Sequence, residues 1–354
     1  MKCSLLVVAF LIVLGTVTGC NGYNTNEDKE VSEDTYNSKM VDIQKQTSSE
    51  IYAMDTVMNI AYYAEDDKLM KNLIDKIEEL EVDFSVSLPT SDIYKLNMQS
   101  EVRVSEDTKE LVNKAIGLCK ETKGALDITL YPVIAEWGFI DDKYEVPTKD
   151  TLSNLLKYVG YKTIDVKQNT IAIPKGVQID LGSVAKGYLG DELSSMLEAE
   201  NIDSAILNLG GNIQTIGKKP DGTLWAVGIQ NPTAEDYVAV VEVDNKAVIT
   251  SGIYERYFKG EDGNYYCHII DPATGMPVNN ELASVTIIGE SGVRCDALST
   301  ALFVMGLQEA ENFWRQNKDF EAVFITKSNE IYFTKGLSNN INIIDQDLKV
   351  GVIE

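Results

Sequence analysis

The spacing of apolar residues along the chain predicts several amphipathic helices. In residues 66–82, Leu69, Leu73, Ile77 and Leu80 recur at helical spacing, and acidic residues occupy the first turn. A more apolar stretch, "RCDALSTALFVMG", is also expected to be helical. The predicted helices cover residues 66–82, 105–120, 148–158, 188–199 and 294–306.

Short runs rich in β-branched and aromatic residues lie between these helices and predict strands. The predicted strands cover residues 51–63, 204–209, 224–229, 238–243, 284–288, 321–325 and 331–334. Helices and strands do not alternate in a regular βα repeat, so the pattern favours an α+β fold over a barrel or a Rossmann fold. Neither GxGxxG nor GxxxxGK[ST] occurs, which removes the two commonest nucleotide-binding loops.

The N-terminus resembles a lipoprotein export signal, and the alternative is an ordinary secretory signal that ends near a cysteine. A basic Lys2, an apolar run too short to span a bilayer and the sequence Val17-Thr18-Gly19-Cys20 resemble a bacterial lipoprotein signal whose cleavage leaves Cys20 lipidated. Residues 20–48 are mostly polar and predict a flexible tether, leaving residues 49–354 as the folded domain. We therefore expect a protein held by lipid on the extracytoplasmic face of the cell membrane.

The charge of the chain limits its partners. A formal net charge of −24 argues against nucleic acid as a partner. A phosphate ligand would need a cation between itself and this acidic protein. The three cysteines of the domain, Cys119, Cys267 and Cys295, cannot all pair with one another, and Cys119 falls on an apolar helical face that predicts burial.

The stretch "IDLGSVAKGYLGDEL", residues 179–193, has features of a phosphate site. A β-like segment enters a turn at Gly182, where the backbone can approach a ligand closely. A helix then begins, so its N-terminus offers free N–H groups and Lys186 adds a cation one turn in. A glycine before a helix is common, and these residues alone leave the phosphate site as one interpretation among others.

Asp296 and Thr300 are separated by four residues on the helix predicted at 294–306. This separation places the carboxylate and the hydroxyl on the same face, one turn apart. Hard oxygen ligands of this kind suit Mg²⁺, which commonly keeps ligand phosphates in its coordination shell. Alternatively, Asp296 caps the helix and Thr300 bonds back to a carbonyl.

Two further stretches combine polar groups with glycines or aromatic rings. Gly210-Gly211 ends a predicted strand and fits either a tight hairpin or the close approach of a ligand. Residues 247–260 hold a dense polar and aromatic group that either lines a pocket or pairs across strands. His268, the only histidine of the chain, directly precedes the segment "IIDPATGMP".

Taken together, these stretches resemble the successive motifs of the ApbE-like FAD:protein FMN transferases. The resemblance runs in order from about residue 51 to residue 306. The matching stretches are "MDTVMNI", "SDIYKLN", "GALDITLYPVIAEWGF", "IDLGSVAKGY", "LNLGGNI", "TSGIYERYF", "HIIDPATGMP" and "DALSTALFVMG".

The resemblance implies an α+β fold of two intimately packed lobes, which is T-fold-like. It also implies Mg²⁺-dependent transfer of FMN from FAD to a Thr or Ser hydroxyl of a target protein, with release of AMP. By similarity, Mg²⁺ would be bound by Asp296, Thr300 and the main-chain carbonyl of Ser183, and His268 would be the catalytic base or position the acceptor. The residues expected to contact FAD are Met54, Ser87, Ala125, Leu126, Asp127, Asp180, Lys186 and Ile270.

Two positions depart from the family pattern. Relatives often have glycine where this chain has Asp55, and an aromatic residue near Ser87. Lys186 and Asp180 remain alternative proton carriers to His268. A Mg²⁺-dependent FAD pyrophosphatase and a lipoprotein that only binds flavin are compatible with the same motifs.

Overall fold

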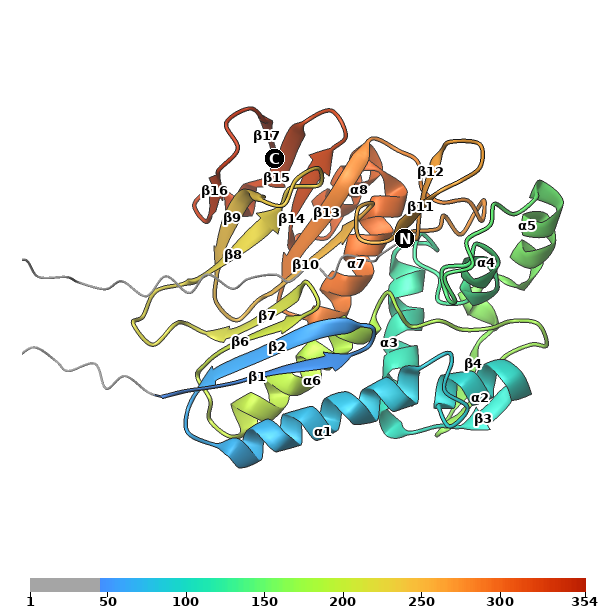
Figure 1. Cartoon of the computed structure of the whole chain (residues 1–354), viewed down its shortest axis with the longest axis horizontal. Helices are drawn as coiled ribbons and strands as arrows, with labels where there is room; N and C mark the ends of the chain where they lie inside the picture. The colour runs from blue at the N-terminus through green and yellow to red at the C-terminus, as the bar shows by residue number, and fades with distance from the viewer. Residues whose placement is uncertain (1–44) are drawn as a thin grey trace, which may run out of the picture. The chain divides into compact units, whose positions relative to one another are not determined.

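A computed structural model describes residues 45–354 of the protein (Figure 1). The signal segment 1–19, Cys20 and most of the predicted tether lie outside the described residues. The α-helices are α1 (Asp67–Phe84), α2 (Asp92–Gln99), α3 (Glu106–Glu121), α4 (Tyr131–Glu136), α5 (Lys149–Leu155), α6 (Ala185–Ala199), α7 (Gly292–Met305) and α8 (Leu307–Gln316). No helix in residues 45–354 combines the length and apolar character that a membrane span requires.

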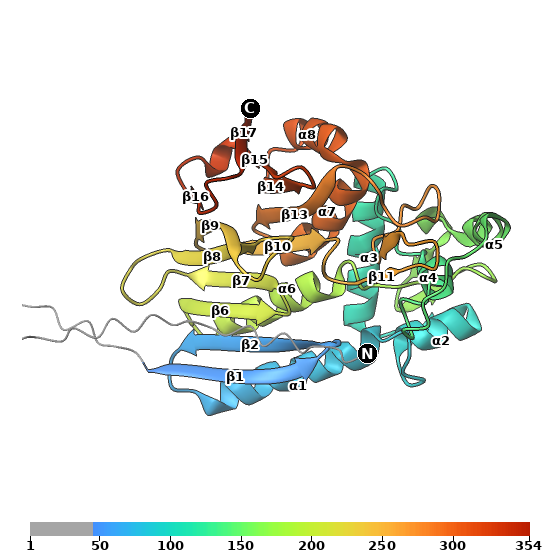
Figure 2. The same ribbon diagram turned by 45° about the horizontal axis from the view of Figure 1, so that its top comes forward.

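A nine-stranded sheet forms the centre of the fold, in the order β1-β2-β6-β7-β10-β13-β14-β15-β17. Its strands are β1 (Gln46–Ala53), β2 (Thr56–Tyr63), β6 (Ser204–Leu209), β7 (Asn212–Gly217), β10 (Ala247–Gly252), β13 (Leu282–Gly289), β14 (Glu321–Thr326), β15 (Glu330–Thr334) and β17 (Lys349–Ile353). Neighbouring strands are antiparallel except for β15 and β17, which are parallel. The strands follow one another across the molecule in Figure 2.

Both faces of this sheet are covered. Helices α1, α6, α7 and α8 lie on one face, and the three-stranded sheet β16-β9-β8 covers the other. Its strands are β8 (Trp225–Gln230), β9 (Tyr237–Val243) and β16 (Ile341–Ile343). Strand β13 is buried at every position, with Val285 and Ile287 toward the helices and Ile288 toward the small sheet. Because the two layers bury alternate residues of one strand, β13 is mostly apolar, and its polar residues Ser284 and Thr286 are buried as well.

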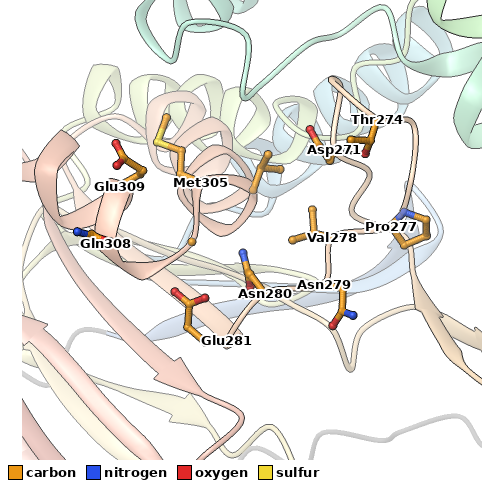
Figure 3. A pocket seen from close by; sticks show the side chains of 12 residues that line it. Asp271, Thr274, Pro277, Val278, Asn279, Asn280, Glu281, Met305, Gln308 and Glu309 are labelled. Carbon is orange, nitrogen blue, oxygen red and sulfur yellow. Dashed lines mark hydrogen bonds between the residues drawn. The ribbon is translucent and has the colours of Figure 1, made fainter. Parts of the chain in front are cut away.

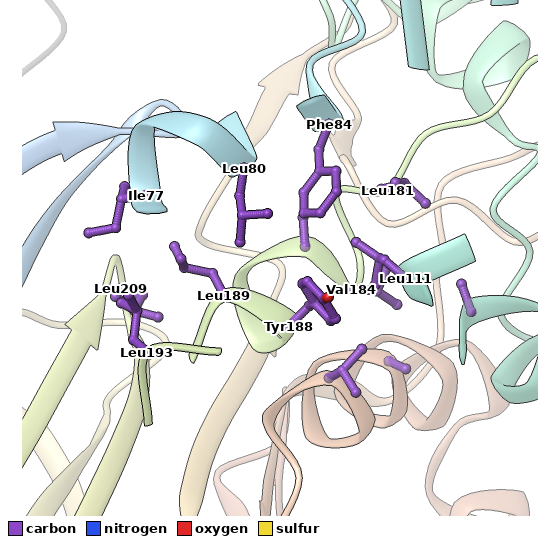
Figure 4. Close-up of a cluster of buried hydrophobic side chains, with 14 of the residues drawn as sticks. Ile77, Leu80, Phe84, Leu111, Leu181, Val184, Tyr188, Leu189, Leu193 and Leu209 are labelled. Atoms are coloured by element: carbon purple, nitrogen blue, oxygen red, sulfur yellow. The ribbon is translucent and has the colours of Figure 1, made fainter. Parts of the chain in front are cut away.

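Helix α6 lies at the centre of the helical layer. Its buried residues include Tyr188, Leu189 and Leu193. Figure 4 shows these side chains among residues of α1 and α3, including Phe84 and Leu111. The rings of Phe84 and Tyr188 meet edge to face, with centroids 5.9 Å apart. This packing fixes the position of the N-terminus of α6.

A second region packs beside the large sheet and its helices. It contains α2, α4, α5 and two small sheets, β3-β5-β4 and β11-β12. The strands are β3 (Glu101–Arg103), β4 (Asp165–Lys167), β5 (Thr170–Ala172), β11 (Tyr257–Lys259) and β12 (Tyr265–Cys267). A small core that includes Val133, Trp137, Phe139 and Ile270 joins α4 to the segment after β12. The predicted α+β class is confirmed.

The predicted strand 51–63 is in fact a hairpin of two strands. β1 and β2 are joined at Met54 and Asp55, whose φ angles of +49° and +59° are left-handed. This conformation suits a two-residue turn, and glycine would adopt it at the position of Asp55 without strain. β1 begins at Gln46, so residues 46–48 of the predicted tether form part of this edge strand, where polar side chains remain exposed.

The boundaries of the other predicted elements need smaller corrections. Helix α6 begins at Ala185, three residues before the predicted start. Helix α5 ends at Leu155, and one 3₁₀ turn (Leu156–Tyr158) completes the predicted segment. The three cysteines Cys119, Cys267 and Cys295 are buried and unpaired, in agreement with their odd number.

Candidate active site

Helices α6 and α7 approach each other so closely that the contact point has room only for glycine on each helix. A Cβ atom at Gly187 of α6 would lie 2.3 Å from the carbonyl oxygen of Gly292 and 2.7 Å from Cβ of Asp296, both on α7. A Cβ atom at Gly292 would lie 2.5 Å from the carbonyl oxygen of Gly187. These two glycines therefore set the distance between the helices.

Asp191 of α6 fixes the start of α7. Its carboxylate accepts hydrogen bonds from the N–H groups of Gly292 at 2.5 Å and Val293 at 3.0 Å, and from the Ser291 hydroxyl at 3.1 Å. Ser291 is the N-cap of α7, so Asp296 lies in the second turn. The alternative in which Asp296 caps the helix is therefore wrong, because Ser291 and Asp191 already satisfy the first N–H groups.

Asp296 is a buried carboxylate with few partners. It is 6% exposed, and its Oδ2 accepts one hydrogen bond, at 2.8 Å, from the N–H of Gly187. Burial raises the pKa of Asp296, while Lys186, the Gly187 N–H and the nearby Asn212 amide favour its ionised form. Asn212 Nδ2 is itself buried without a partner in hydrogen-bond geometry. A buried charge with so little compensation suits a bound cation.

The hydroxyl of Thr300 lies beside other hydroxyl groups rather than a helix carbonyl. Ser251 Oγ lies 3.3 Å from Thr300 Oγ1 and 2.8 Å from Ser299 Oγ. Ser251 belongs to β10, so the strand and α7 contribute oxygen atoms to the same place. Within residues 45–354, no three His, Cys, Asp or Glu side chains gather into a metal-binding cluster. A metal ion here would therefore rely on one carboxylate together with hydroxyl, carbonyl and ligand oxygens, which is a set that Mg²⁺ accepts.

Lys186 connects the charged groups of the site. Burial raises the pKa of the Asp180, Glu255 and Asp296 carboxyls, and the Lys186 ammonium partly offsets this rise. Burial lowers the pKa of His268, and Lys186 adds to that effect. The structure thus brings together Asp180, Lys186, His268 and Asp296, which are far apart in sequence. We call these four residues and Glu255 the Lys186 cluster.

Glu255 is the member of the Lys186 cluster that sequence reasoning did not select. Part of its side chain is accessible, but the surrounding protein and the charge of Asp296 raise the pKa of the carboxyl to about 7, against the effect of Lys186. Glu255 lies in the motif "TSGIYERYF", whose dense polar character was the available signal. That signal could not identify which polar residue faces the site.

His268 directly follows β12 and is partly buried. Its Nδ1 lies 3.2 Å from the carbonyl oxygen of Arg256, and its main-chain N–H donates to the same oxygen at 3.0 Å. Because a carbonyl only accepts, this contact assigns the proton to Nδ1 and leaves Nε2 free to accept one. Burial lowers the pKa of His268 to about 4, so the imidazole is neutral at neutral pH.

Asp180 lies in the segment that leads to α6. Burial raises the pKa of its carboxyl, and the Gly182 N–H, Arg256 and Lys186 oppose this effect. Oδ1 accepts the Gly182 N–H at 2.9 Å, which forms the turn before the helix. The side chain of Asn97 holds the preceding residue through two hydrogen bonds with the main chain of Ile179, at 2.7 and 2.8 Å. This accounts for the asparagine in "SDIYKLN".

Both oxygens of the Asp127 carboxylate accept hydrogen bonds from within the protein. Oδ1 accepts hydrogen bonds from the N–H and the hydroxyl of Thr129, and Oδ2 accepts the N–H of Tyr161 at 3.0 Å. The adjacent Ile128 carbonyl accepts the N–H of Asp180 at 2.8 Å, so this segment borders the Lys186 cluster. Any contact of Asp127 with a ligand would therefore use the main chain.

The other predicted contacts lie in different settings. The side chains of Leu126 and Ile270 are buried in apolar cores, at 2% and 4% exposure, while Ala125 is partly exposed. Met54 lies in the β1–β2 turn, where its N–H donates to Glu81 of α1 at 2.7 Å. Two others lie in loops: Ser87 is exposed after α1, and Ser183 is in the turn before α6. Within residues 45–354, no hydrogen bond or ion pair joins Met54 or Ser87 to the Lys186 cluster.

The fold is that of a known protein family. The sequence model of the ApbE family matches residues 54–324, and the chain belongs to this family. The match covers every member of the Lys186 cluster, as well as Thr300 and Ser251.

Individual relatives agree with this assignment. A FAD:protein FMN transferase from Vibrio cholerae is 33% identical over 267 residues, covering 72% of this chain and 79% of that protein. The crystal structure of an ApbE protein from Thermotoga maritima has a TM-score of 0.75 at 30% identity, covering 81% of this chain and 96% of that one. The flavin transferase ApbE from Vibrio cholerae has a TM-score of 0.76 at 29% identity, covering 84% and 99% of the two chains. The resemblance seen in the sequence is therefore confirmed.

Proposed function

We propose that this protein transfers FMN from FAD to a Thr or Ser hydroxyl of an acceptor protein and releases AMP. The observation that carries the proposal is the convergence of Lys186, His268 and Asp296 in a member of the ApbE family. The cluster combines a cation, a neutral base and a buried carboxylate. Transfer of a phosphoryl group between a diphosphate and a hydroxyl needs groups of these kinds.

The N-terminus of α6 would bind the diphosphate of FAD. No side chain caps this helix, and its first turn carries Lys186. The positive end of the helix dipole and the ammonium both favour a phosphate at this position. They would place the FMN-side phosphorus beside the Lys186 cluster and offset the negative charge of the protein.

Asp296, Thr300 and the main-chain carbonyl of Ser183 would hold Mg²⁺. The buried and weakly compensated charge of the Asp296 carboxylate supports a cation at this place. When bound, Mg²⁺ stabilises negative charge on the reacting phosphate, an effect of several kcal/mol. The protein's own contribution is a rigid carboxylate, because the Gly187 N–H fixes one of its oxygens.

His268 would accept the proton of the incoming hydroxyl. Its Nδ1 is committed to the Arg256 carbonyl, which leaves Nε2 as the basic atom. A positioned base contributes roughly 10²–10⁴-fold to such a reaction. Transfer of the hydroxyl proton to Nε2 raises the nucleophilicity of the hydroxyl oxygen. This oxygen then forms the new ester bond to the FMN phosphorus as the bond between that phosphorus and the AMP oxygen breaks.

The test of this proposal mixes the purified protein with FAD, Mg²⁺ and candidate acceptor proteins. Flavin fluorescence that remains on a denatured acceptor, with an FMN adduct in its mass spectrum, is the expected result. Free FMN and AMP without an adduct would instead identify a FAD pyrophosphatase. Intact FAD after prolonged incubation would leave only a flavin-binding lipoprotein.

We also propose that the protein works on the extracytoplasmic face of the membrane, tethered by lipid on Cys20. The lipobox-like sequence before Cys20 supports this location. Exported or membrane-bound redox proteins would then be its acceptors. Fractionation of cells that produce the Cys20→Ala protein should move it from the membrane to the soluble fraction, and an unchanged distribution would contradict lipid anchoring.

A further inference from the structure

His268 lies at the open end of the hairpin formed by β11 and β12 (Figure 1). Three residue pairs join the two strands, and the pair farthest from the connecting loop is Tyr257 with Cys267. The main-chain N–H of His268 donates to the Arg256 carbonyl, which adds one more hydrogen bond at the open end. A two-stranded hairpin has little stability by itself, so the position of its open end depends on contacts with the rest of the protein.

The chain after His268 is held in a turn. The Asp271 carboxylate accepts the Thr274 hydroxyl at 2.8 Å, and Figure 3 shows these two side chains next to each other. The Gly275 carbonyl accepts the indole N–H of Trp137, also at 2.8 Å. These hydrogen bonds fix the main chain beyond His268 but do not involve the imidazole. The orientation of the ring therefore depends on the contacts of the ring itself.

Three contacts join His268, Arg256 and Phe139 into a closed network. The imidazole Nδ1 lies 3.2 Å from the Arg256 carbonyl oxygen. The Arg256 guanidinium donates from Nη2 to the Phe139 carbonyl at 2.5 Å. The ring of Phe139 meets the imidazole edge to face, with centroids 6.5 Å apart. Each of the three residues thus contacts the other two.

Phe139 gives this network a rigid base. Its side chain is 1% exposed and belongs to the small core that includes Trp137. Its main-chain N–H donates to the Ile134 carbonyl of α4 at 3.2 Å. The Phe139 carbonyl therefore has a fixed position, and the hydrogen bond from Arg256 holds the open end of the hairpin next to it.

The Arg256 guanidinium has no competing partner of equal strength. Its Nη2 lies 3.9 Å from Asp142 Oδ1, which is beyond hydrogen-bond distance, and the Arg256 side chain is 50% exposed. Among residues 45–354, the Phe139 carbonyl is the one hydrogen-bond acceptor of this guanidinium. A hydrogen bond from a charged donor is roughly twice as strong as a neutral one, so this contact can hold a half-exposed side chain in place.

We propose that Arg256 is a positioning residue for His268. Its side chain anchors the open end of the hairpin to Phe139, and its carbonyl then accepts the Nδ1 proton of the imidazole. This contact selects the tautomer in which Nε2 is unprotonated and can accept the proton of the incoming hydroxyl. The inference rests on the proposed transfer function and adds the residue that prepares its base.

Nitrogen NMR of the full chain, labelled with ¹⁵N-histidine and free of a histidine tag, tests the proposal. His268 is the only histidine, so the spectrum at pH 7 reports the protonation of its two ring nitrogens alone. The parent should show one tautomer with the proton on Nδ1, and Arg256→Ala should show a mixture of both tautomers. The transfer rate of Arg256→Ala at saturating FAD should fall about tenfold, which is part of the roughly 10²–10⁴-fold that a positioned base contributes. Its affinity for FAD should stay within twofold of the parent, on the order of experimental error.

Two further variants and a control separate positioning from general damage. Arg256→Met keeps a long side chain without donors and should behave like Arg256→Ala, so it decides the question even if Arg256→Ala folds poorly. Arg256→Lys keeps a charged donor and should recover most of the tautomer and the rate. Arg103→Ala is the matched control, because Arg103 is exposed on β3 and its loss changes the net charge equally. This control should match the parent.

Two results would overturn the proposal. One is a single Nδ1–H tautomer and a parental transfer rate in both Arg256→Ala and Arg256→Met. The other is a weaker affinity for FAD with an unchanged rate at saturating FAD, which would make Arg256 a FAD contact. If the parent modifies no acceptor protein, the transfer function is refuted, while the tautomer spectra still decide whether Arg256 orients the imidazole.

Discussion

Replacing Gly187 with alanine tests whether the close packing of α6 and α7 builds the site. The new Cβ atom would lie 2.3 Å from the Gly292 carbonyl oxygen and 2.7 Å from the Cβ atom of Asp296. Neither neighbour is the flexible end of a side chain, so the helices must move apart. The movement would pull the Gly187 N–H away from the Asp296 carboxylate.

The expected loss of stability combines three effects. Overpacking in a rigid core costs typically about 1–3 kcal/mol. Weakening the charge-assisted hydrogen bond at 2.8 Å costs up to about 1.5–3 kcal/mol. Alanine has a greater helix preference than glycine, which offsets this loss of stability by up to about 1 kcal/mol. The free energy of unfolding should therefore fall by roughly 1.5–5 kcal/mol, and the rate of FMN transfer should fall because Asp296 is displaced.

Urea unfolding followed by circular dichroism measures the stability, and flavin transfer to an acceptor measures the activity. Gly190→Ala is the control on the same helix, because its Cβ atom would meet its nearest neighbour at 3.4 Å. Gly117→Ala isolates the helix preference, since nothing lies within 4 Å of its new Cβ atom. A Gly187→Ala protein as stable and active as the Gly190→Ala protein would refute the reasoning.

Asp296→Ala should abolish transfer and the Mg²⁺ dependence of FAD binding, which titration calorimetry with and without Mg²⁺ measures. His268→Ala should still bind FAD but lose transfer; parental transfer rates across neutral pH would disprove the assignment of the base. Because burial lowers the pKa of His268 to about 4, the unfolded chain binds its proton first as the pH falls from about 6.5. Between pH 7 and pH 5 the parent should therefore lose about 2 kcal/mol more stability than His268→Ala, and unfolding curves that shift equally in both proteins would contradict this. Asn97→Ala should destabilise the protein by about 1–3 kcal/mol and weaken FAD binding, because the Ile179 main chain loses both partners.

The sequence alone predicted the local parts of this structure well. Amphipathic spacing identified α1 and α3, because their buried residues recur with the helical period. The four-residue separation of Asp296 and Thr300 required only helical geometry. The ordered motifs were sufficient for the ApbE family, which the comparisons confirm.

The tertiary structure decided how these parts form a site. The Asp127 carboxylate and the side chains of Leu126 and Ile270 are engaged in internal contacts, which a motif cannot distinguish from ligand contacts. The turn at Met54 and Asp55 depends on the register of two paired strands, and a run of strand-forming residues does not show where the chain reverses.

The convergence of Glu255, His268 and Asp296 around Lys186 has the same origin. These residues come from α6, from the turns beside β11 and β12, and from α7, so no local pattern relates their positions. The contact between Gly187 and Gly292 brings the two helices together, and the Arg256 carbonyl orients the imidazole. The sequence therefore determined which chemical groups are available, and packing between distant segments determined which of them meet.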